Sequence, residues 1–161
     1  MIEIAGATQE LVRPRTEIPQ APAADATDLR RACLAVLRAE WSSLALVAAD
    51  AAAAGQAVAA ELAELARAYR LRPVQVVGGA GASPAQIPLL QDELAAAGSG
   101  REARVVVTLG DPRADPATAP LLVHVDAALL VVRLGTSEIA AIEEIVGLVG
   151  RERVIGCVVA R

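Results

Sequence analysis

Apolar segments alternate with amphipathic ones along most of the chain. Five short runs are apolar at nearly every position, which is typical of strands in a parallel sheet covered on both faces. These runs span residues 44–48, 73–77, 103–108, 127–132 and 154–159. The stretches between them repeat apolar residues at helical spacing, so they predict helices. The pattern therefore predicts a three-layer α/β/α fold with a mostly parallel sheet.

The expected helices differ in how clearly their ends are marked. One begins near residue 27, one covers 56–70, and one has Ser83 as its cap and continues from Pro84 to Ala97. A short helix opens at 115–116. Thr136 and Ser137 are expected to cap the last helix, which carries Ile139, Ile142, Val146 and Val149. Residues 1–26 are rich in proline without periodicity, which predicts a flexible arm before one domain at 27–161.

Composition narrows the chemistry. Ala, Val and Leu must build the core, because only 1% of the 161 residues are aromatic. All 15 basic residues are arginine, which excludes Schiff-base chemistry and a lysine on phosphate. One histidine and two distant cysteines exclude the usual zinc sites, so we expect no metal centre.

Charge and hydropathy limit the partners. The net charge is -4, so we expect no nucleic acid partner. The longest apolar stretch, 42–60, contains Asp50 and Gln56 and is mostly alanine, which argues against membrane insertion. The first residues lack the pattern of a signal peptide. These features together predict a cytoplasmic protein.

The turn after the first predicted strand is the expected ligand site of such a sheet. A P-loop reads G-x-x-x-x-G-K-[ST]. Here Gly55 matches the second glycine, Gln56 replaces the lysine, Ala57 replaces the hydroxyl residue, and Asp50 stands near the first glycine. Gln56 supplies no positive charge, Ala57 offers no oxygen to Mg²⁺, and an inward Asp50 would repel phosphate. We therefore expect no catalytic residue and no bound cofactor.

Residues 27–161 resemble a MinD/ParA-type P-loop domain, and within that group the cytoplasmic kinase domain of bacterial tyrosine kinases. The likeness rests on the helix DLRRACLAVLRAEW before the loop, on D-x-x-x-x-V-x-x-x-x-T-S at 126–137, and on the closing strand VIGCVVAR. The resemblance implies a P-loop NTPase-like fold and a link to polysaccharide co-polymerases in capsule and exopolysaccharide assembly.

The departures from that family fall on its chemistry. The Asp-x-Asp that ends the family's second strand is replaced by Gly78, Gly79 and Ala80, and Asp111 is displaced from the family's acidic position. The asparagine that helps to read the base is Ala160. The family ends in a tyrosine cluster, whereas Tyr69 is the only tyrosine here.

Together the losses predict a pseudokinase or pseudo-ATPase that regulates polysaccharide assembly through protein contacts. The expected partner is a membrane polysaccharide co-polymerase or a related assembly protein, which would recruit the chain to the inner face of the plasma membrane. The sequence also allows the chain to form a homo-oligomer. The alternative is a divergent ATP- and Mg²⁺-binding kinase or hydrolase that uses arginine in place of the P-loop lysine, with Arg72, Arg104, Arg113 and Arg133 as candidates.

Several other residues are of types found in catalytic, metal or cofactor sites, but their surroundings favour a structural role. The glycine-rich GGAGAS at 78–83 is interpreted as a turn, not a dinucleotide site, and Asp111 and Asp115 as turn and cap residues, not metal ligands. The remaining candidates are expected to be structural: His124 partly buried, Cys33 and Cys157 inert in the core, Trp41 at the core edge, and Glu143 and Glu144 facing solvent.

Overall fold

Five parallel strands form one sheet in the computed structural model, which describes residues 26–49, 52–100, 102–133 and 135–160. The strands are β1 (Ser43–Ala48), β2 (Val74–Gly78), β3 (Arg104–Leu109), β4 (Ala127–Arg133) and β5 (Val154–Ala160). The helices are α1 (Ala26–Arg38), α2 (Ala52–Ala68), α3 (Ile87–Ser99), α4 (Ala119–Val123) and α5 (Ile139–Val149), with short 3-10 turns at Pro116–Thr118 and Arg151–Arg153. The predicted α/β class with a parallel sheet is confirmed.

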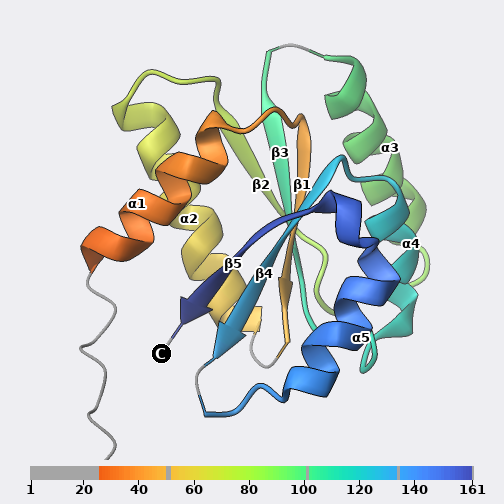
Figure 1. Ribbon diagram of the computed structural model, residues 1–161. Helices are drawn as coiled ribbons and strands as arrows, with labels where there is room; N and C mark the ends of the chain where they lie inside the picture. The colour runs from red at the N-terminus through yellow and green to blue at the C-terminus, as the bar shows by residue number, and fades with distance from the viewer. Residues whose placement is uncertain (1–25, 50–51, 101, 134, 161) are drawn as a thin grey trace, which may run out of the picture.

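Helices cover both faces of the sheet, as Figure 1 shows. Alternate strand residues point to opposite faces, and the buried residues divide accordingly. On β1, Leu44 and Leu46 pack with α1 and α2, while Ala45 and Val47 pack with α3, α4 and α5. Burial on both faces of the three central strands, β1, β3 and β4, explains why their apolar runs show no polar alternation.

The strand order is β2-β3-β1-β4-β5, so β1 lies in the middle of the sheet. The chain leaves β1 through α2 for the outer strand β2, returns through α3 to β3, and then crosses β1 through α4 to reach β4. The connections that follow β1 and β3 lie on opposite faces. A topological switch point therefore lies at the carboxyl ends of β1 and β3, where open α/β sheets bind ligands.

Three helix starts differ from the sequence prediction. The cap position of α5 is Glu138, whose side chain makes no capping hydrogen bond, so the prediction of Thr136 and Ser137 as caps is wrong. Helix α2 begins at Ala52, four residues before the expected Gln56, because the alanines that precede it continue the helix. Helix α3 begins at Ile87 and not at Pro84, because residues 83–86 close a turn first. In that turn the Gln86 amide donates to the Ser83 carbonyl oxygen, and the Ser83 amide donates to Gln86 Oε1.

Three further predictions concern the start of the first helix, the N-terminal arm and the membrane. Helix α1 starts at Ala26, next to the predicted Thr27. The predicted arm lies outside the described residues, apart from Ala26. Within the described part of the chain, none of the helices combines the length and hydropathy needed to cross a membrane.

Candidate functional site

The connection from β1 to α2 occupies the switch point. Strand β1 ends at Ala48 and α2 begins at Ala52, so three residues separate the strand from the helix. A P-loop instead places a longer glycine-rich loop between strand and helix, and the loop's amides surround the phosphates. Here residues 52–54, which fill three of the loop positions before Gly55, already belong to α2.

Three residues that align with the end of the P-loop signature, Gly55, Gln56 and Ala57, lie inside α2. Gly55 is buried, and a Cβ built on it would lie 3.7 Å from the Ala48 Cβ, so this glycine allows α2 to approach β1. Gln56 and Ala57 are exposed on α2, whereas the next two residues turn toward the sheet and are buried. Asp50 lies outside the described residues.

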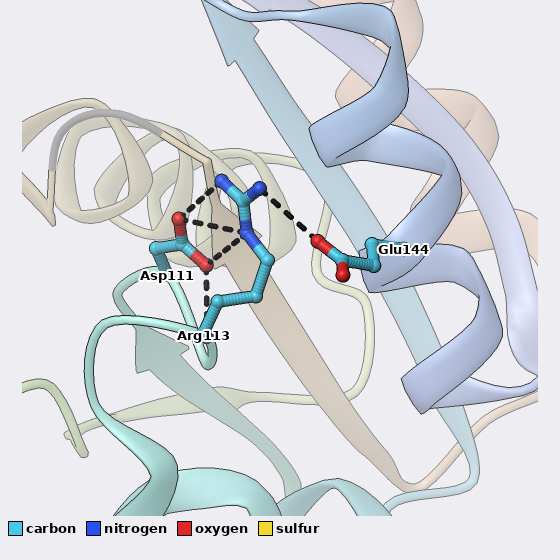
Figure 2. A network of polar contacts seen from close by, with 3 residues as sticks. All are labelled: Asp111, Arg113 and Glu144. Atoms are coloured by element: carbon cyan, nitrogen blue, oxygen red, sulfur yellow. Dashed lines mark hydrogen bonds and ion pairs between the residues drawn. The ribbon is translucent and has the colours of Figure 1, made fainter.

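Charged side chains gather where β3 ends, beside α5 (Figure 2). Asp111 follows β3 by two residues, and its carboxylate accepts hydrogen bonds from Arg113. Arg113 Nη2 lies 2.6 Å from Asp111 Oδ2, Arg113 Nε lies 3.0 Å from Oδ1, and the Arg113 amide lies 2.9 Å from Oδ1. The guanidinium also donates to α5, where Arg113 Nη1 lies 3.3 Å from Glu144 Oε2. We call these three residues the carboxyl-edge cluster.

The charged groups of the carboxyl-edge cluster pair with one another. The hydrogen bond from Arg113 holds the pKa of the Asp111 carboxyl below its usual range, and the same bond raises the pKa of the Arg113 guanidinium. Two carboxylates surround one guanidinium, so the cluster carries a net negative charge, which repels a phosphate. The oxygens of Asp111 are engaged by Arg113, and the described residues contain no group of carboxylates, histidines and cysteines arranged to hold a metal ion.

Two of the four arginines proposed for an unusual ATP site lie at the wrong end of the sheet. Arg72 precedes β2, and its Nη2 donates to the carbonyl oxygens of Gly100 and Ala103, at 2.7 Å each. Arg104 starts β3 and donates to the carbonyl oxygens at the end of α1. The prediction that these two side chains reach the cleft is therefore wrong, because the amino ends of β2 and β3 lie a full strand away from it.

The glycine-rich turn after β2 packs against β3. The amides of Gly79 and Ala80 both donate to the Thr108 carbonyl oxygen, at 2.9 and 3.0 Å. The Gly81 amide, in a residue with a φ of 70°, donates to Asp115 Oδ2 at 3.3 Å. Two of the amides are thus occupied by a carbonyl oxygen and the third by a carboxylate, in keeping with a turn.

The lone histidine and the two thiols are placed differently from one another. Cys33 is fully buried as expected, and burial raises the pKa of its thiol to about 11. Cys157 lies on the edge strand β5 and is exposed, so the expectation of a core thiol is wrong there. His124 caps α4 with its Nδ1 3.0 Å from the Pro120 carbonyl oxygen, but it is exposed instead of partly buried.

Trp41 packs at the core edge as predicted. The Trp41 Nε1 donates to the Val36 carbonyl oxygen at 2.8 Å, and the Arg104 guanidinium lies over its ring at 4.6 Å from the centroid. Glu143 and Glu144 both face solvent, as expected. The role of Glu144 as a partner of Arg113 was not foreseen, because 31 residues separate them.

Comparison with known proteins does not assign the chain to a family. A scan against models of protein families finds no match, and a search of curated proteins finds none. The resemblance to the tyrosine kinase domains thus stays a hypothesis that rests on the residues quoted for it.

Proposed function

We propose that this chain is a non-catalytic relative of P-loop enzymes, a pseudokinase or pseudo-ATPase that works by contacting other proteins. The observation that carries the proposal is the state of the switch point. Three residues join β1 to α2, and Gly55, Gln56 and Ala57, which align with the end of the phosphate-binding signature, lie within the helix. Catalysis of phosphoryl transfer depends on charge placed around the phosphates. At this edge of the sheet Arg113 is paired with Asp111 and Glu144, and Arg133, which ends β4, is the arginine left to the alternative of an arginine-based enzyme.

The neighbouring charges support the same conclusion. Arg113 lies in the turn after β3, and its guanidinium forms ion pairs with Asp111 and Glu144. Removing one contact that stabilises a transition state typically costs about 10²–10³ in rate. Several such contacts are missing here, so turnover of a nucleoside triphosphate would be negligible.

The proposed setting is polysaccharide assembly. It follows from the resemblance of residues 27–161 to the kinase domains that pair with polysaccharide co-polymerases. In that setting the chain binds the cytoplasmic face of a co-polymerase, or of a related assembly protein, and is recruited by it to the inner face of the plasma membrane.

Calorimetry tests the absence of nucleotide chemistry. We expect no binding heat when the native protein is titrated with ATP or ADP, with and without Mg²⁺. The double variant Gln56→Lys, Ala57→Ser restores the side chains of the signature, yet we expect it to bind no better, because both positions are exposed within α2. Micromolar Mg²⁺-dependent binding by the native protein defeats the proposal, and turnover lost in an Arg133→Ala variant would favour the arginine-based enzyme instead.

Fractionation tests the proposed setting separately. The protein should sediment with membranes from cells that contain the co-polymerase and become soluble when the co-polymerase is removed. A distribution that does not change on removal would discard the polysaccharide setting and leave the non-catalytic assignment standing.

A further inference from the structure

A hollow lies at the other end of the sheet, between the last turn of α2 and the start of β2. Its volume is 400 Å³. The floor is apolar and the rim carries two guanidinium groups, Arg67 and Arg70; the apolar lining includes Ala63, Ala66, Pro73 and Val74. We call it the β2 hollow. A cavity of this composition suits a ligand that combines an apolar group with a negative charge.

Arg70 occupies a backbone position that usually belongs to glycine. Its φ is 52°, in the left-handed region, where it ends α2. The Leu71 amide donates to the Ala66 carbonyl oxygen at 2.8 Å, which closes the helix end in the usual way for such a residue. Glycine would adopt this conformation without strain. Within the described part of the chain, the Arg70 side chain makes no hydrogen bond or ion pair.

The positive charge beside the β2 hollow is only weakly compensated by carboxylates. Arg67 pairs with Glu64 across one turn of α2, but both side chains are more than two-thirds exposed, so the pair is weak. Arg72 and Arg104 lie close by and donate to carbonyl oxygens, not to carboxylates. Burial and the charge of Arg72 both lower the pKa of Arg104, as expected of neighbouring cations. This end of the sheet therefore gathers four guanidinium groups, on a chain whose net charge is -4.

Strand β2 offers main-chain hydrogen bonds next to the hollow. It lies at one edge of the sheet, and among the described strands it pairs with β3 alone. Val76 is 43% exposed and Leu71 40% exposed, so apolar surface continues from the hollow along the strand. An unpaired strand edge is a template for an added strand.

We propose that β2 receives an extended acidic segment of a partner protein as an additional strand. Residues i and i+2 of a strand point to the same face. An apolar side chain of the segment would enter the β2 hollow, and an acidic side chain two positions away would meet Arg67 and Arg70. A second copy of this chain is a poor occupant, because its β2 carries no acidic side chain to meet Arg67 and Arg70.

The inference is independent of the argument about nucleotides, because the β2 hollow lies at the opposite end of the sheet. The probes are labelled eight-residue peptides in which leucine or valine alternates with serine and is followed two positions later by glutamate or aspartate. Matched peptides carry glutamine or asparagine instead. We expect the acidic peptides to bind at least tenfold more tightly, with an affinity that falls with salt, in fluorescence polarisation. Amide resonances of Leu71, Val74 and Val76 should shift on binding.

Arg70→Gly separates binding from folding. Glycine relieves the left-handed strain at the end of α2, so the variant should melt no lower than the native protein, while acidic peptides bind about tenfold more weakly. Arg151→Ala is the matched control, because it removes one exposed and unpaired arginine from the turn after α5; its peptide affinity should stay native.

The proposal is overturned if acidic and amide peptides bind alike or not at all, or if Arg70→Gly leaves the affinity unchanged. It is equally overturned if a short oligothymidylate binds the hollow more tightly than the peptides, or if sedimentation shows that β2 is covered by a second copy.

Discussion

Substitution of Gly79 by alanine tests the interpretation of the glycine-rich turn as a packing element. A Cβ on Gly79 would lie 2.7 Å from Leu109 Cδ2 and 2.9 Å from Val107 Cγ2. Both distances are shorter than real Cβ contacts, and both neighbours are fully buried, so neither side chain can swing into solvent. Overpacking of this kind costs about 1–3 kcal/mol. We expect Gly79→Ala to lower the free energy of unfolding by that amount.

Gly78→Ala provides a matched control one residue earlier. A Cβ at Gly78 would meet nothing within 4 Å, so this variant should unfold within about 0.5 kcal/mol of the native protein. Urea denaturation followed by circular dichroism measures both. Equal stability of the two variants would refute the packing argument and reopen the turn as a ligand loop.

Three further predictions concern the core, the thiols and the carboxyl-edge cluster. Leu62→Ala should cost about 2–5 kcal/mol in urea unfolding, since Leu62 is fully buried, whereas Leu89→Ala on the exposed side of α3 should be near neutral. In the native protein, Cys157 should react with a thiol reagent and Cys33 should react only after unfolding; two fast thiols would contradict the buried placement. Because the folded-state pKa of Asp111 is depressed, the stability it contributes should be present above about pH 4 and be lost as the pH falls through the lower folded value. The difference between native protein and Asp111→Asn should therefore shrink on acidification, and a constant difference would contradict the ion pair.

The type and order of the elements could be predicted from the sequence, because apolar strands and amphipathic helices differ in period. Helix starts were harder. The alanines before Gly55 have high helix propensity and extend α2 backward, whereas the P-loop alignment had favoured a loop there. Cys157 looked buried because its neighbours are apolar, but β5 is an edge strand and one face of it is open. Strand order decides that, and periodicity does not reveal strand order.

The carboxyl-edge cluster was only half visible in the sequence. Asp111 and Arg113 are two residues apart and lie in a proline-rich turn, so their pairing is local. Glu144 reaches them from α5 because the turn after β3 lies beside this helix (Figure 2), a consequence of the chain's crossing that no local pattern encodes. For the same reason, the sequence allowed Arg72 and Arg104 as phosphate ligands, whereas the direction of the strands places both at the amino edge of the sheet.

A titration of the isotopically labelled native protein with Mg²⁺-ATP, followed by amide resonances, tests the central claim most directly. The account predicts no saturable shift of the amides of Gly55, Gly110 or Arg113 up to millimolar nucleotide. Saturable shifts at these residues with a micromolar Kd, abolished when Mg²⁺ is chelated, would contradict it.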